Sequence, residues 1–224
     1  MSIEVERKFI CSANTLKTLQ EIGVCAGQSK FHDQYFDTPQ FHLTLRDMWL
    51  RKRKGCWELK CPTTRVKVAE ESEASALCSR YKEITNLSDI KLKLQEVLKD
   101  IGEHVTSTKQ SSSVTEMDSA QDQCWTRSMN LVIFAEFTTV RQTFTLEEYG
   151  VQVDLDEADF GYCVGEIEAL IPEGGDMQAA MDKIERTAKK LGLTGNQRVD
   201  GKMSVYLQEH YPEHYARLLS EHII

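Results

Sequence analysis

Ile3-Glu4-Val5-Glu6-Arg7-Lys8-Phe9, near the start of the chain, is the stretch that decides the fold. Side chains alternate between the two faces of a β-strand, so Glu4, Glu6 and Lys8 share one face. The apolar residues Ile3, Val5 and Phe9 share the other. Two acids and a base therefore point the same way. Taken alone, a half-buried strand with a solvated charged face explains this pattern.

The same alternation recurs in other segments that favour β-strands. Strands are predicted near residues 2–10, 31–36, 47–54, 56–61, 80–85, 130–146, 150–156 and 162–170. Five of the later segments carry charges on one face: Trp49, Arg51 and Arg53; Glu58 and Lys60; Arg141; Asp154 and Asp156; Glu166 and Glu168. A solvated outer surface would explain any one of these faces.

A closed barrel is the second explanation for so many charged faces of both signs. An antiparallel sheet that closes on itself turns the charged faces inward around a hydrated lumen, and its apolar faces pack against helices. In such a lumen, acids bind divalent cations through oxygen, and arginines and lysines bind phosphate oxygens. The combination suits a polyphosphate with magnesium. Bare carboxylates would repel phosphate, and an all-basic lumen could not hold the metal.

A few helices are expected beside the strands, because apolar residues there recur with helical spacing. One is capped by Asn14 and ends at Ile22, and a second runs from Ser88 to Ile101. A third is capped by Asp176 and stops at Gly192, and the tail after Lys202 is helical with an interruption at Pro212.

The bulk composition predicts one globular domain over residues 1–224, with 41% hydrophobic and 28% charged residues. Residues 104–123 are rich in Ser, Thr, Gln and Asp, which predicts a mobile surface loop. A formal net charge of −8 argues against nucleic acid and anionic membranes as partners, so an anionic ligand must be bound by a local basic cluster.

The compartment expected from the sequence is the cytosol. There is no apolar signal segment behind the first charges and no run of about eighteen apolar residues. Seven scattered cysteines without a CxxC pair suggest free thiols in a reducing compartment. Neither these cysteines nor the six histidines have the spacing of a zinc site.

The ordered charged residues resemble the CYTH, or triphosphate tunnel, superfamily. Glu4-Val5-Glu6-Arg7-Lys8 is similar to its ExExK signature, and the others follow in that family's order: Arg51, Arg53, Lys60, Arg141, Asp154, Glu166, Glu168 and Lys202. The resemblance covers nearly the whole chain except about 63–80 and 100–130. It implies an α+β fold, a closed antiparallel eight-stranded β-barrel flanked by helices.

The resemblance also implies roles for these residues. Magnesium would be held by Glu4, Glu6, Asp154, Glu166 and Glu168. The triphosphate would be bound by Lys8, Arg51, Arg53, Lys60, Arg141 and Lys202, and Glu166 counts with the substrate-binding set as well. Phosphoryl transfer needs a metal that polarises phosphoryl oxygens and a water placed in line with the leaving oxygen.

Three further stretches resemble the thiamine triphosphatase branch of that superfamily: Tyr35-Phe36-Asp37-Thr38-Pro39, Trp57-Glu58-Leu59-Lys60-Cys61-Pro62 and Asp159-Phe160-Gly161-Tyr162. They imply hydrolysis of thiamine triphosphate to thiamine diphosphate and phosphate. Lys60 and Tyr35 are the candidates for orienting or deprotonating the water, since a crowded basic site could lower the pKa of a lysine. Equally, Lys60 could be only a phosphate ligand and Tyr35 a packed aromatic.

Trp49 is the candidate for recognising the organic group, because it shares a strand face with Arg51 and an aromatic face attracts the cationic thiazolium. Packing is the competing explanation for a tryptophan on a barrel strand. Two other functions remain open: an inorganic triphosphatase, and a non-catalytic polyphosphate-binding module. A superfamily adenylate cyclase fits less well. A monomer with a small-molecule substrate is expected.

Overall fold

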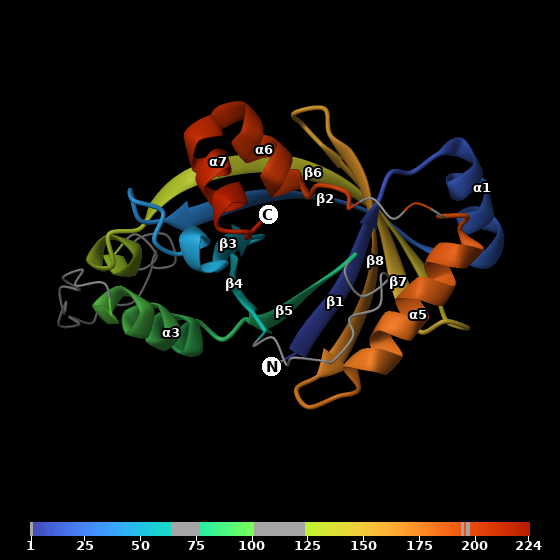
Figure 1. Cartoon of the computed structure of the whole chain (residues 1–224), viewed down its shortest axis with the longest axis horizontal. Helices are drawn as coiled ribbons and strands as arrows, with labels where there is room; N and C mark the ends of the chain where they lie inside the picture. Colours follow the sequence, from blue (N-terminus) through green and yellow to red (C-terminus); the bar gives the residue numbers. More distant parts are fainter. Residues whose placement is uncertain (1, 64–76, 101–123, 194, 196–197) are drawn as a thin grey trace.

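The computed structural model describes residues 2–63, 77–100, 124–193, 195 and 198–224. Eight strands close into one antiparallel barrel in the order β1-β5-β4-β3-β2-β6-β7-β8 (Figure 1). They are β1 (Ser2–Phe9), β2 (Val24–Asp37), β3 (Trp49–Arg53), β4 (Cys56–Pro62), β5 (Cys78–Ile84), β6 (Val132–Leu146), β7 (Val151–Ala158) and β8 (Cys163–Pro172). The predicted fold class is confirmed. The loop predicted at 104–123 lies outside the described residues.

Each predicted strand is present, but the bounds of two differ in an informative way. β2 begins at Val24 instead of residue 31, because its first half pairs with β6 from Val24 opposite Thr145 onward. That half is mostly exposed and therefore carries little apolar alternation. β3 begins at Trp49 instead of residue 47, because Asp47 has a φ of 57° and lies in the left-handed region, which ends strand geometry.

The helices lie close to their predicted places. They are α1 (Ala13–Ile22), α3 (Leu87–Asp100), α5 (Met177–Lys190), α6 (Lys202–His210) and α7 (Pro212–Ser220). Asp176 caps α5 as predicted, and its side chain accepts a hydrogen bond from the Ala179 amide. The predicted cap of α1 is wrong: Ser12, not Asn14, accepts from the Thr15 amide. No described helix is long and apolar enough to cross a membrane.

Apolar side chains on the outside of the barrel pack against the helices in separate clusters. α1 and α5 cover β1, β7 and β8 through residues such as Leu19 and Ile184. α3 covers β3, β4 and β5, where Leu94 lies among Leu50 and Leu59. α6 and α7 lie over the long strands β2 and β6 (Figure 1) and pack against aromatic residues of both. Because the apolar faces of the strands point outward and pack against the helices, the charged faces point inward and line the lumen.

Gly165 shows how tightly the two acid-bearing strands β1 and β8 pair. It lies opposite Phe9, and a Cβ at this position would meet the Phe9 ring at 2.2 Å. The missing side chain therefore gives the Phe9 ring its place over β8. The same pairing sets Lys8 opposite Glu166 and Glu6 opposite Glu168.

Asp37, at the end of β2, organises the loop that leads into β3. Its side chain is fully buried. The carboxylate accepts hydrogen bonds from the amides of Thr38 (2.7 Å), Leu43 (2.9 Å) and Thr44 (2.8 Å), and from the Thr44 hydroxyl (2.8 Å). The Thr44 hydroxyl also contacts Nε2 of His214 on α7 at 2.9 Å. One carboxylate thus connects β2, the loop and α7.

We expect Asp37→Ala to lower the free energy of unfolding by about 3 kcal/mol, because it leaves buried amides without an acceptor. Asp37→Asn keeps one acceptor oxygen and should cost less. Urea titration of both variants measures the difference. A cost for Asp37→Ala within about 0.5 kcal/mol of zero would contradict the organising role.

Candidate functional site

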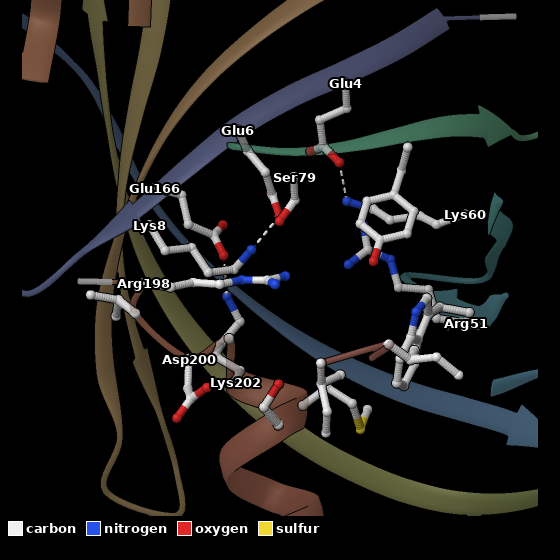
Figure 2. Close-up of a pocket in the computed structure, with 18 of the residues that line it drawn as sticks. Glu4, Glu6, Lys8, Arg51, Lys60, Ser79, Glu166, Arg198, Asp200 and Lys202 are labelled. Carbon is white, nitrogen blue, oxygen red and sulfur yellow. Dashed lines mark hydrogen bonds and ion pairs between the residues drawn. The ribbon is translucent and has the colours of Figure 1, made fainter. Parts of the chain in front are cut away.

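The lumen contains a pocket lined by charged side chains from most of the strands and by the start of α6 (Figure 2). Eleven of the sequence-predicted residues line it: Glu4, Glu6, Lys8, Tyr35, Trp49, Arg51, Arg53, Lys60, Arg141, Glu166 and Lys202. Asp154 and Glu168 are the other two, and they do not line the pocket itself. In Figure 2 Lys60 and Arg51 lie on one side, and Lys8, Glu166 and Lys202 on the other.

Opposite charges lie beside each other along the lumen because the strand register pairs them. Arg51 lies opposite Glu58, and Arg53 opposite Asp33. On the far side of the barrel Arg141 lies opposite Asp156. Each such pair puts a base next to an acid, so charges that are costly to remove from water compensate each other in a largely buried site.

Arg141 is the most heavily contacted base. Its guanidinium binds Asp156 in a bidentate pair, at 2.6 Å and 2.7 Å, and donates to Asp154 at 2.5 Å and to Glu166 at 3.1 Å. Lys202, at the first turn of α6, contacts both Asp156 and Glu166. The bases Lys202, Lys8 and Arg141 outweigh the effect of burial and hold the pKa of Glu166 well below its usual range.

Arg51 and Arg53 project from β3. Arg53 makes a bidentate pair with the fully buried Asp33, at 2.6 Å and 2.7 Å, and its guanidinium lies 3.9 Å from the centre of the Phe31 ring. Arg51 makes an ion pair with Glu58 at 2.5 Å. Within the described part of the chain, the buried Nε of Arg51 has no hydrogen-bond acceptor. This donor is available to a bound anion.

Lys60 lies beside Glu4, with which it makes an ion pair, and 3.5 Å from Glu83. Burial alone would lower the pKa of Lys60, but the carboxylates of Glu4 and Glu6 outweigh it and raise the pKa. The prediction that a crowded basic site lowers the pKa of Lys60 is therefore wrong, because acids surround this lysine as closely as bases do. Tyr35, its expected partner, instead lies opposite Arg51 in the strand pairing and hydrogen-bonds to it.

The acids of the lumen suit a hard divalent cation. Among the described residues, no cysteine or histidine belongs to the pocket lining, and carboxylate oxygen is the ligand that magnesium prefers. Burial, followed by the nearby carboxylates of Glu4 and Asp154, raises the pKa of Glu168 to about 8. Burial also raises the pKa of Glu4 to about 7, although Lys60 opposes the shift. Burial and neighbouring carboxylates therefore disfavour the charged forms of these two acids, and a bound cation would favour them.

The acids would have to change partners to hold such an ion. Among the described residues, no three acidic, histidine or cysteine side chains lie close enough together to hold a metal. Glu4 and Glu6 are engaged by Lys60 and Lys8, respectively. A cation that takes over these carboxylates would release the two lysines, and both could then turn to phosphate.

Several lining residues were not predicted from the sequence. Tyr81 and Ser79 share one face of β5, but burial along this strand does not alternate, so no apolar pattern marks that face in the sequence. Arg198 comes from the segment before α6, which has no periodicity to mark it. Figure 2 shows Arg198 on the side of the pocket that holds Lys8 and Lys202. Arg198 makes no ion pair with another described residue, unlike the predicted bases.

Comparison with solved structures shows the same fold. The chain is similar to the PH1819 protein of Pyrococcus horikoshii, with a TM-score of 0.55 and 15% identity over 92% of this chain and 99% of that one. It is also similar to a Hippeastrum protein described as an adenylyl cyclase with a dominant triphosphatase activity. That match has a TM-score of 0.54 and 17% identity over 93% of this chain and 96% of the other.

Comparison of sequences identifies the family in addition to the fold. The chain is 35% identical to the thiamine-triphosphatase of Homo sapiens, over 97% of this chain and 89% of the relative. It is 36% identical to that of Macaca fascicularis over the same shares. The family model described as the CYTH domain matches residues 2–200. Because both the barrel with its charged lumen and this match extend over nearly all of the described chain, the protein belongs to the CYTH domain family.

Proposed function

We propose that this protein hydrolyses thiamine triphosphate to thiamine diphosphate and phosphate, with magnesium as the metal. The observation that carries the proposal is the lumen pocket, whose lining includes four arginines, three lysines and three glutamates. Two relatives at 35% and 36% identity that are named thiamine-triphosphatase support the choice of substrate. CYTH proteins are metal-dependent triphosphatases, which agrees with the acids of the lumen.

The bases bind and orient the triphosphate. Arg51 and Arg53 lie on one strand two residues apart, about 7 Å along its length, so they reach neighbouring phosphoryl groups. Arg141, Lys8 and Lys202 face them across the lumen. Charge-assisted contacts of this kind fix the phosphate chain for in-line attack and neutralise the charge that develops during transfer.

Glu4, Glu6, Asp154, Glu166 and Glu168 would hold magnesium, which supplies polarisation of phosphoryl oxygens when bound. Lys60 and Tyr35 orient the attacking water, since both line the pocket, Tyr35 bonded to Arg51 and Lys60 on the same side of the pocket in Figure 2. Trp49, on the same strand as Arg51, takes the thiazolium on its ring face. The same proposal includes a cytosolic monomer, in line with the net charge of −8 and with scattered cysteines.

Product analysis tests the proposed reaction. With magnesium, each turnover should yield one thiamine diphosphate and one phosphate, which chromatography of the thiamine compounds and a phosphate assay measure together. Release of diphosphate with thiamine monophosphate would contradict cleavage at the terminal phosphate. Absence of both products would contradict the function.

The role of Lys60 is tested by kinetics. If Lys60 orients the water, Lys60→Ala should lower kcat by about 100-fold with little change in KM, because the lost contact belongs to the transition state. If Lys60 only binds ground-state phosphate, KM should rise while kcat stays near the wild-type value. Steady-state rates with thiamine triphosphate separate the two patterns, and the second would remove Lys60 from the chemical step.

A further inference from the structure

Asp47 holds two aromatic residues of the pocket with one oxygen atom. Its Oδ1 accepts a hydrogen bond from the indole N–H of Trp49 at 2.9 Å and another from the hydroxyl of Tyr81 at 2.8 Å. Trp49 and Tyr81 line the pocket, whereas Asp47 does not. The carboxylate therefore lies behind the pocket wall, and the two rings connect it to a ligand in the pocket.

The two rings come from strands that do not pair with each other. Trp49 begins β3 and lies opposite Lys60, whereas Tyr81 belongs to β5 and lies opposite Glu4. β4 runs between these strands in the barrel. The hydrogen bonds to Asp47 thus connect the edges of two aromatic side chains across β4. Without this shared acceptor, each ring could turn about its own side-chain torsions.

The backbone conformation at Asp47 helps to position its carboxylate between the two rings. Its φ of 57° lies in the left-handed region, at the end of the short 3-10 helix Thr44–Arg46, and Asp tolerates that conformation better than most residues. The buried Asp37 carboxylate fixes the same loop through the amides of Leu43 and Thr44. The backbone conformation at Asp47 and the fixed loop before it therefore set the position of the Asp47 carboxylate.

The charge of Asp47 also affects what the rings can bind. A hydrogen bond from a neutral donor to a carboxylate is stronger and shorter than one between neutral groups. The negative charge at the indole edge makes the ring face more attractive to a cation. Burial and the neighbouring Asp47 raise the pKa of Tyr81, so its hydroxyl keeps its proton and remains a donor.

We propose that Asp47 is a positioning residue that determines specificity, because it orients Trp49 and Tyr81 as two aromatic faces for an organic cation attached to the triphosphate. The proposal rests on the proposed function, in which that cation is the thiazolium of thiamine. It adds a residue outside the pocket lining that sets the preference for this substrate over a bare triphosphate.

The test compares thiamine triphosphate with tripolyphosphate, which shares the phosphates but has no ring. The measured quantity is the ratio of kcat/KM for the two substrates. Asp47→Gly removes the acceptor and keeps the left-handed backbone free of strain, and it should lower the ratio about three- to tenfold. Asp47→Asn keeps an acceptor oxygen and removes the charge, and it should fall between wild type and Asp47→Gly.

Three further variants complete the comparison. Asn130→Gly is the matched control, because Asn130 is exposed, has a φ of 55° and does not line the pocket, so the ratio should stay at the wild-type value. Tyr81→Phe removes only the hydroxyl and should lower the ratio by less than Asp47→Gly does. In a Trp49→Ala background, Asp47→Gly should have a smaller effect than in wild type, because residues that act through one another are not additive.

The outcomes separate this inference from the proposed function. Equal losses for both substrates in Asp47→Gly would make Asp47 a purely structural residue and overturn the inference. A lower ratio in Trp49→Ala but an unchanged ratio in Asp47→Gly would overturn the inference and leave the role of Trp49 intact. An unchanged ratio in Trp49→Ala would overturn both. No hydrolysis of thiamine triphosphate by the wild-type protein, with tripolyphosphate hydrolysed, would instead contradict the proposed function.

Discussion

We expect excess EDTA to abolish hydrolysis by this protein, and magnesium added back to restore it. The reason is the charge of the lumen, where buried carboxylates lie among the bases that must bind phosphate. Without a cation, Glu4 and Glu6 occupy Lys60 and Lys8. The metal contribution to phosphoryl transfer is worth several kcal/mol, so the expected loss is about a thousandfold or more.

Phosphate release in EDTA, with and without excess magnesium, measures this effect, and a thermal melt in EDTA checks that the fold persists. Calcium should compete without supporting turnover, because it prefers a larger and less regular coordination sphere than magnesium. Full activity in EDTA would contradict a metal-dependent reaction. Turnover with calcium equal to that with magnesium would contradict the selectivity.

Arg53→Ala should lower kcat/KM for thiamine triphosphate by about 30- to 1000-fold, or about 2–4 kcal/mol of transition-state stabilisation. The guanidinium is oriented by its bidentate pair with Asp33 and by the Phe31 ring, so its position is set before substrate binds. Arg51→Ala should fall in the same range. Arg53→Lys keeps the charge without the planar fork and should be intermediate.

Stability has to be separated from activity in this variant, because Arg53→Ala leaves the buried Asp33 unpaired and such a loss is destabilising in itself. The double variant Arg53→Ala/Asp33→Asn removes the unpaired charge. It should recover much of the melting temperature but not the rate. Recovery of both would assign Arg53 to the fold and contradict its role in phosphate binding.

The sequence predicts the barrel because the alternation of apolar and polar residues that marks a strand is a local pattern. Period-two alternation marks every strand whose outer face is buried, as in β1, β7 and β8. It fails in the first half of β2, where neither face is buried. It also fails at Asp47, whose left-handed backbone follows from the turn geometry and not from any apolar pattern.

The residues of the candidate site also divide into those that the sequence predicts and those that it does not. Residues on a charged strand face, such as Arg51 and Glu166, could be predicted to share the lumen because alternation fixes their direction. The partner of each base could not be predicted, because it depends on strand register: Tyr35 meets Arg51 only since β2 pairs with β3. Arg198 and Asp47 lie outside the strands, and three-dimensional contacts alone assign them to this region.

The central claim, a magnesium-dependent hydrolase for thiamine triphosphate, is tested most directly by one comparison of substrates. We would measure kcat/KM for phosphate release from thiamine triphosphate, tripolyphosphate and ATP, each with and without magnesium. The account predicts the highest value for thiamine triphosphate and no turnover of any substrate without the metal. A higher kcat/KM for tripolyphosphate would indicate an inorganic triphosphatase, binding without phosphate release would indicate a non-catalytic module, and either result would contradict the account.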